Sequence, residues 1–286
     1  MKDILTVTCS HHKLMMLMQA HTLNKFYTTP TTHYIFLEDD IMSVGEWQEW
    51  LQPEYTKHKL VIIPAHSERI VDNVEKLGWF RQQWIKFWAS TFIKNDYIIL
   101  DSKNFFINSM SEDDFPEEGN NRVGWLSHGK NKEHRPFINY VHKKYKLPYY
   151  DSFWTIETPF VFRKTVVEKI LDLDCKDLFE HALMFLPSEF ILYRMASDTE
   201  VINARELHNK LPLSTVFWTE EQLRKVNTPI IGMHDYIFFK SHERALDYLE
   251  QYKNRNIIPE YIFELFKQFN GHPRIYNKTT EYTVTE

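Results

Sequence analysis

The stretch from Asp96 to Asn108, DYIILDSKNFFIN, is the feature that most constrains how this 286-residue chain can fold. Its apolar run Tyr97–Leu100 ends in the polar cluster Asp101–Asn104. A continuous apolar run is typical of a strand that is buried on both faces, as in parallel sheets covered by helices. In open sheets of this kind, ligands bind beyond the carboxyl ends of the strands. We therefore expect Asp101 to lie at a functional site.

Three earlier apolar segments have the same character, namely Ile4–Cys9, His33–Leu37 and Lys59–Ile63, and polar or turn-forming residues follow each of them. Helical segments separate the strands, and Ser10 is expected to cap the first helix. Alternation of strands and helices predicts an α/β fold with a mostly parallel central sheet and helices on its faces. The polar residues after the strands would then share one edge of the sheet.

The segment 78–89, which precedes the Asp101 strand, has the spacing of an amphipathic helix. Trp84 and Trp88 recur four residues apart on one face, and Gln83 and Lys86 lie three residues apart on another. An amide and an ammonium therefore lie on the helix that leads into the strand with the polar end. The alternative is that both are ordinary surface residues.

Composition excludes several classes of protein. The net charge is −5, with no block of Lys and Arg that would follow nucleic acid or anchor to a membrane surface. Cys9 and Cys175 are too few for a disulfide framework, and no apolar run approaches the roughly 20 residues of a membrane span. Glycine-rich dinucleotide and P-loop motifs are absent. We expect a cytoplasmic protein with no integral membrane segment and no nucleic-acid partner.

The pattern G-W-x-x-Q-Q-x-x-K at 78–86, followed by I-L-D-S-K-N-F-F at 99–106, resembles an uncharacterised bacterial and phage family placed among the GT-A glycosyltransferases. The resemblance covers most of the chain, from the first strand to His234. It implies a GT-A-like catalytic domain in residues 1–240, followed by a helical appendage with a polar tail in 241–286. It also implies transfer of a sugar from a nucleotide-sugar donor to a glycan or other hydroxyl acceptor.

The family carries an Asp-x-Asp motif at this strand end, where it holds the metal and the diphosphate of the donor. Here the motif is Asp101-Ser102-Lys103, so an ammonium replaces the second carboxylate. The resemblance implies Asp101 and His234 as ligands of a Mn²⁺ or Mg²⁺ ion. Lys103 would repel such an ion and can contact the diphosphate itself as a point charge. A divalent metal is therefore a doubtful cofactor.

Other contacts to the donor follow from the same arrangement of strand ends. Carboxylates after the second strand suit the ribose or base of a nucleotide, and the turn after the first strand would flank the same base. Asn104 can donate to a sugar hydroxyl. For each of these residues, the alternative is a solvated polar loop. The residues expected to bind the nucleotide sugar are Thr8, Ser10, Asp39, Gln83, Lys86, Asp101, Lys103 and Asn104.

Glu189 follows Ser188 at the start of a predicted helix. It resembles the acidic position that deprotonates the acceptor hydroxyl in inverting GT-A enzymes, a role that requires hydrogen-bond reach to that hydroxyl. The alternative is a carboxylate that only stabilises the helix N-terminus, by about 0.3–1 kcal/mol. We expect Glu189 to be the catalytic base if the reaction inverts configuration; if it retains configuration, Glu189 loses this assignment.

Two other functions are compatible with the sequence. A non-catalytic GT-A relative could bind a saccharide or a partner protein through the same cleft, and Lys103 favours this alternative. A metal hydrolase could use His66, Asp101 and His234. The sequence disfavours the hydrolase because it has no H-x-H, H-x-x-E-H or H-E-x-x-H spacing.

Overall fold

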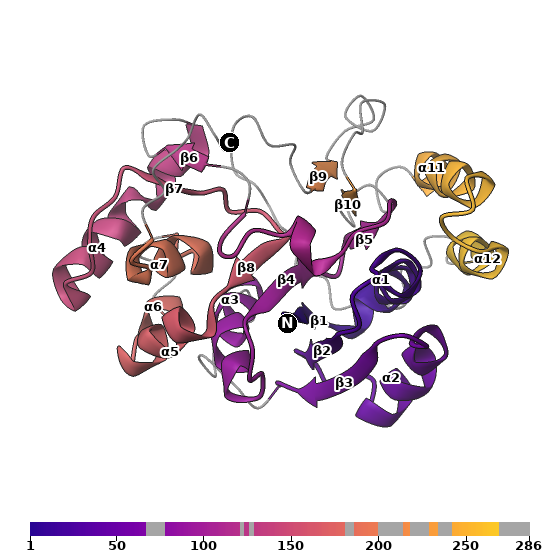
Figure 1. Ribbon diagram of the computed structural model, residues 1–286, viewed down its shortest axis with the longest axis horizontal. Coiled ribbons are helices and arrows are strands. Elements are labelled where there is room, and N and C mark those ends of the chain that lie inside the picture. Colours follow the sequence, from indigo (N-terminus) through magenta and orange to yellow (C-terminus); the bar gives the residue numbers. More distant parts are fainter. Residues whose placement is uncertain are drawn as a thin grey trace.

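The centre of the computed structural model is a five-stranded sheet with the order β3-β2-β1-β4-β8 (Figure 1). The structure describes residues 1–66, 78–120, 123–125, 129–180, 186–199, 214–217, 229–233 and 242–268. The strands of the central sheet are β1 (Asp3–Thr8), β2 (Thr32–Leu37), β3 (Lys59–Pro64), β4 (Tyr97–Asp101) and β8 (Phe160–Phe162).

The parallel register places the carboxyl ends of β1, β2 and β4 beside one another, at the same end of the sheet. β1 runs parallel to β2, with Thr8 opposite Leu37, and parallel to β4, with Val7 opposite Asp101. The chain places β2 and β3 on one side of β1 and β4 on the other. The crevice beyond the ends of β1 and β4 is therefore the position where open α/β sheets bind ligands. Only β8 is antiparallel to its neighbour in this sheet.

Helices cover both faces of the sheet, as the alternating pattern predicts. The helices are α1 (Lys13–Phe26), α2 (Val44–Leu51), α3 (Gly78–Trp88), α4 (Arg135–Tyr145), α5 (Lys164–Asp172), α6 (Asp177–Glu180), α7 (Glu189–Ala196), α11 (His242–Asn254) and α12 (Glu260–Gln268). Short 3₁₀ turns are η1 (Ser10–His12), η2 (Gln52–Glu54), η3 (Ala89–Thr91), η4 (Glu112–Asp114) and η5 (Gly129–His134). No described helix has the length and apolarity required to cross a membrane. The prediction of an α/β fold with a mostly parallel sheet is confirmed.

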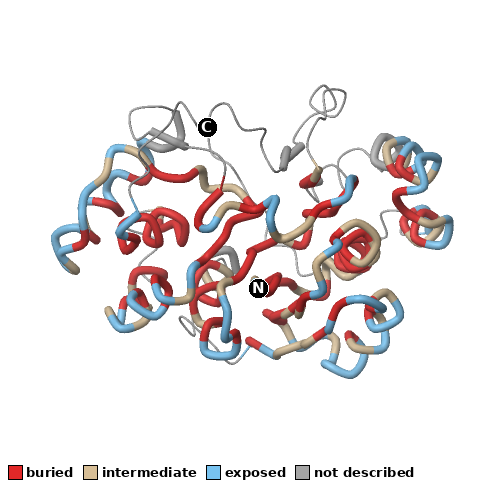
Figure 2. The backbone as a smooth tube through the Cα atoms, in the orientation of Figure 1, coloured by how far each residue is buried: buried red, intermediate tan, exposed pale blue. Residues whose placement is uncertain are grey.

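Two hydrophobic cores lie on opposite faces of the sheet, and Figure 2 shows that the backbone of the central strands between them is largely buried. Successive side chains of a strand point to opposite faces, so Ile4 packs into the core with α1, α2, α11 and α12, and Leu5 packs into the core with α3 and α7. Ile98 and Ile99 of β4 divide in the same way. The central strands are thus buried on both faces, which explains their continuous apolar sequences.

Two small sheets extend the molecule beyond the central one. The first contains β5 (Asn104–Phe106), β10 (Ile230–Met233) and β9 (Ser214–Phe217), and β5 follows β4 after a two-residue turn. The second pairs β6 (Val123–Trp125) with β7 (Ser152–Trp154). The turn between β4 and β5 consists of Ser102 and Lys103, which fixes both residues at the edge where β4 ends.

The start of α1 differs from the prediction. Ser10 does not cap α1; it begins η1, and α1 starts three residues later at Lys13. The Ser10 hydroxyl instead donates a hydrogen bond to Asp39 Oδ2 over 2.8 Å. At the other end of the chain, α11 and α12 contribute Leu249 and Ile262 to the same core as α1.

Candidate active site

A cavity of about 320 Å³ opens beyond the carboxyl ends of β1 and β4. Its lining includes Gln83 and Lys86 of α3, Asp101 and Lys103 at the end of β4, and Glu189 at the start of α7. Residues from three separate elements therefore converge on one space. The sequence named all five as candidate site residues, and the structure brings them together.

Lys86 lies at the centre of this group. Its Nζ is 2.8 Å from Oε1 of Glu189 and 3.3 Å from Oδ1 of Asp101, and its side chain is only 7% exposed. Burial alone would lower the pKa of Lys86, but the charges of Glu189 and Asp101 outweigh it, so the pKa is raised above its usual value. The Phe190 ring lies 5.2 Å from the ammonium. Lys86 is therefore a fixed, buried cation.

The Asp101 carboxylate, at the end of β4, pairs with the ammonium groups of Lys86 and Lys103. Its Oδ2 is 3.2 Å from Nζ of Lys103 and 3.0 Å from Thr158 Oγ1, whose single hydrogen is shared with Asn104 Oδ1. Burial would raise the pKa of Asp101, but the charges of Lys86 and Lys103 outweigh burial and hold the pKa well below its usual range. Asp101 is consequently ionised, and it orients both ammonium groups.

The buried amide side chains of Asn104 and Gln19 hold the loop that carries Asp101 in place. Asn104 Oδ1 accepts hydrogen bonds from the Asp101 backbone N–H over 2.7 Å and from Thr158 Oγ1 over 2.7 Å. Gln19 of α1 donates to the carbonyl oxygens of Asp101 and Asn104, each over 2.8 Å, and accepts from Thr6 Oγ1 over 2.9 Å. Sequence reasoning missed Gln19. Its one signal was a polar residue within an otherwise apolar, methionine-rich segment.

Gln83 ties α3 to the start of α7. Its Oε1 accepts a hydrogen bond from the Glu189 backbone N–H over 3.1 Å, whereas its Nε2 is buried without a partner among the described residues. Buried polar atoms are usually hydrogen-bonded, so an orphaned donor beside a cavity indicates a group that a ligand would satisfy. Asn104 Nδ2 is also buried without a described partner, but Asn104 is fully buried and does not line the cavity.

The remaining predicted residues form a second group, after β1 and β2. Asp39 Oδ2 accepts hydrogen bonds from the backbone N–H and hydroxyl of Ser10, over 2.9 and 2.8 Å. His12 links this group to the cavity, which it lines, because its Nδ1 is 3.0 Å from Ser102 Oγ and 3.8 Å from Cys9 Sγ. Thr8 is fully buried in the sheet and does not line the cavity.

Cys9 has an unusual environment in this second group. Burial would raise the pKa of its thiol, but hydrogen bonds with His11 and His12 outweigh burial and lower the pKa to about 6. Cys175 is the contrasting case, because burial raises the pKa of its thiol to about 12. The two cysteines of the chain therefore differ in chemical character.

The residues described around Asp101 do not fit a divalent cation. Each of its carboxylate oxygens faces an ammonium, Oδ1 that of Lys86 and Oδ2 that of Lys103, and Glu189 is already paired with Lys86. A metal ion there would have to lie beside two positive charges. His234, the other implied ligand, lies outside the described residues.

The sheet order, the helices on both faces and the mostly parallel strands define a GT-A-like α/β fold. The galactosyltransferase LgtC, solved in complex with donor and acceptor sugar analogs, matches with a TM-score of 0.51 and 9% identity over 86% of this chain and 94% of LgtC. An active-site mutant of LgtC matches with a TM-score of 0.51 and 9% identity over 87% and 95% of the two chains. At this identity the likeness establishes the fold.

The bifunctional glycosyltransferase WbbM, in its apo form, matches with a TM-score of 0.42 and 10% identity. The match covers 68% of this chain and 36% of WbbM, so the chain spans about a third of that protein. No protein-family model matches the sequence, and no curated protein sequence matches it. The likeness to GT-A proteins is therefore a likeness of fold, and the narrower family named from the sequence stays a prediction.

Proposed function

We propose that this protein is a glycosyltransferase that moves a sugar from a nucleotide-sugar donor to a hydroxyl group of a glycan or another acceptor. The observation that carries the proposal is the buried Lys86 between Asp101 and Glu189, in a cavity at the ligand-binding edge of the sheet. The GT-A-like fold supports it. Membership of the uncharacterised GT-A family and a cytoplasmic location are part of the same proposal.

Lys86 and Lys103 would neutralise the donor diphosphate. Negative charge develops on this leaving group as its bond to the sugar breaks, and cations already in place stabilise it most in a site that excludes water. The Lys103 side chain is 23% exposed, so its ammonium can turn from Asp101 to a phosphate oxygen. Lys86 would stay fixed by its two carboxylates. The orphaned Gln83 Nε2 would donate to a donor oxygen.

Glu189 would act on the acceptor in an inverting reaction. The acceptor oxygen forms a bond to the anomeric carbon while the bond from that carbon to the diphosphate oxygen breaks. The nucleoside diphosphate leaves with the electron pair, and the acceptor proton passes to the Glu189 carboxylate. Lys86 would orient this base through its 2.8 Å contact with Oε1. A reaction that retains configuration would remove this role from Glu189.

Thermal unfolding with a panel of UDP- and GDP-sugars tests donor binding. A ligand present at 100 times its dissociation constant adds about 2.7 kcal/mol to stability, so a true donor should raise the melting temperature. Asp101→Asn should abolish the shift because Lys103 loses the carboxylate that orients it and Lys86 loses one of its two. Asp198→Asn is the matched control, since Asp198 forms an exposed pair with Lys169 and should keep the full shift.

Two results would overturn this proposal. The first is the absence of any shift with all nucleotide sugars at millimolar concentration. The second is an unchanged shift in Asp101→Asn, because binding would then not involve the charges gathered at the end of β4. Circular dichroism of each variant establishes that the fold is intact before the shifts are compared.

A further inference from the structure

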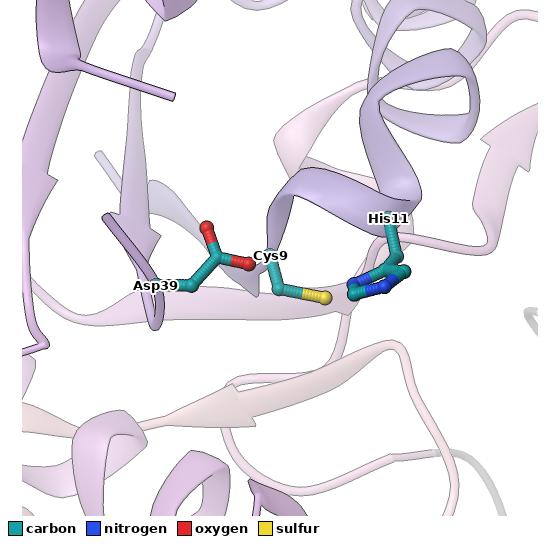
Figure 3. Close-up of side chains that lie close together, drawn as sticks. All are labelled: Cys9, His11 and Asp39. Carbon is teal, nitrogen blue, oxygen red and sulfur yellow. The ribbon is translucent and has the colours of Figure 1, made fainter. Parts of the chain in front are cut away.

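Cys9, His11 and Asp39 form a cluster outside the cavity, at the ends of β1 and β2 (Figure 3). Cys9 follows β1, His11 lies in η1 and Asp39 follows β2. Each offers one ligand atom, and these atoms all lie within 4.8 Å of one another. In Figure 3 the Cys9 sulfur points toward the His11 ring. All three residues are half-buried, so an ion can enter from solvent.

The Asp39 carboxylate supplies an independent sign that this cluster can bind a ligand. Its Oδ2 is held by two hydrogen bonds from Ser10, whereas its Oδ1 is buried with no hydrogen-bond partner in the described part of the chain. Leaving a buried acceptor unsatisfied costs about 1–3 kcal/mol, and more for a charged group. Hydrogen bonds that fix one carboxylate oxygen and leave the other available are the usual second layer of a metal site.

The ligand set selects the metal. Thiolate and imidazole ligands suit Zn²⁺, whereas Mg²⁺ and Ca²⁺ prefer oxygen ligands only. Tetrahedral Zn²⁺, with bonds of about 2.0–2.3 Å, would separate its ligand atoms by roughly 3.3–3.6 Å. The observed atoms lie within 4.8 Å of one another, so side-chain rotations that bring them together by up to about 1.5 Å would close the site.

We propose that Cys9, His11 and Asp39 bind one Zn²⁺ ion and leave its fourth position open. Three protein ligands with one open position are the arrangement of a zinc ion that also binds water or an anion. His12 contacts Cys9 and lines the cavity, so the ion would lie beside the proposed donor site. This inference does not depend on glycosyl transfer. The zinc site would take the place of the ribose contact predicted for Asp39, because Asp39 Oδ1 cannot bind Zn²⁺ and accept a hydrogen bond from a ribose hydroxyl at the same time.

Zinc affinity and stoichiometry test the proposal. The metal-stripped protein is titrated with Zn²⁺ in competition with a chromogenic chelator, and we expect one Zn²⁺ per chain. Cys9→Ser and Asp39→Asn should each weaken binding by at least about 100-fold, since loss of second-layer groups alone costs about 10- to 100-fold. Ser10→Ala should weaken it by about tenfold, because the Ser10 backbone N–H still holds Asp39.

Cobalt substitution identifies the thiolate ligand even if a Cys9 variant fails to fold. Cys175→Ser leaves Cys9 as the one cysteine of the chain, and Cys175 is buried in the core with α3 and α7. We expect Co²⁺ to give a thiolate-to-metal charge-transfer band in wild type and in Cys175→Ser, and Zn²⁺ to abolish it. Absence of the band from Cys175→Ser, or equal Zn²⁺ affinity in wild type and Cys9→Ser, would overturn the proposal.

Discussion

Replacing Lys86 by methionine should strongly destabilise the protein. Methionine keeps much of the apolar stem but removes a cation whose side chain is 7% exposed and which touches Glu189, itself 5% exposed. Asp101 would still have Lys103 and Thr158, whereas Glu189 would lose its ion-pair partner. Removing one partner of a buried pair typically costs about 3–5 kcal/mol, because the remaining charge is left buried. We expect a loss of this size at pH 7.

Urea unfolding measures the loss, and a double-mutant cycle assigns its cause. Lys86→Met with Glu189→Gln should recover at least about 1 kcal/mol relative to Lys86→Met alone, because no uncompensated anion remains at position 189. Lys169→Met is the matched control. Lys169 and its partner Asp198 are 46% and 90% exposed, and such a surface pair contributes at most about 1 kcal/mol.

A free energy of unfolding for Lys86→Met within about 1 kcal/mol of the wild-type value would refute the reasoning. Removal of a buried ammonium between two carboxylates should cost more than that. A double variant whose loss equals the sum of the two single losses would also refute it, since Lys86 and Glu189 would then be energetically independent.

Three other predictions concern chemistry and pH. Glu189→Gln should keep the donor-induced thermal shift but lower kcat by about 10²- to 10⁴-fold, because an amide cannot accept the acceptor proton; full turnover would exclude Glu189 as the base. Wild-type turnover should need no added Mn²⁺ or Mg²⁺, and Lys103→Ala should lower kcat by about 10²- to 10³-fold; turnover that requires either ion and tolerates Lys103→Ala would contradict a phosphate-binding role for Lys103. Burial lowers the pKa of His33 from 6.5 to about 3, so its stabilising contribution is present above pH 6.5 and is lost as the pH falls toward 3. His33→Gln should therefore reduce the slope of unfolding free energy between pH 6 and 4 by about 1.4 kcal/mol per pH unit, and an unchanged slope in urea titrations would show that His33 is not buried in its neutral form.

The parts of the fold that can be predicted from the sequence are those determined by residues close together in the sequence. β4 is recognisable because a strand buried on both faces needs an uninterrupted apolar run, and α3 because its tryptophans recur at helical spacing. Asp101 follows β4, so its place at the edge of the sheet follows from the parallel topology. Ser10 shows the limit of such reasoning, because a capping preference gave way to its hydrogen bonds with Asp39.

The contacts within the site join residues that are far apart in the sequence, so no pattern within one segment predicts them. Lys86 and Glu189 are 103 residues apart in sequence and meet because α3 and α7 pack together. Thr158 reaches Asp101 from a position 57 residues later in the chain. Gln19 is 82 residues before Asp101 and supports its loop from α1. The sequence could name Lys86, Asp101 and Glu189 as candidates, but only the tertiary structure shows that they form one ion-pair network.

The most direct test of the central claim is to measure nucleoside diphosphate release and sugar transfer together. The purified protein is incubated with each nucleotide sugar that raises its melting temperature, with and without hydroxyl acceptors, and the products are followed by mass spectrometry. We predict nucleoside diphosphate and glycosylated acceptor in equal amounts for wild type, and neither above background for Asp101→Asn. Donor binding without diphosphate release, with any acceptor or with water, would contradict a transferase and identify a non-catalytic GT-A relative that binds saccharides.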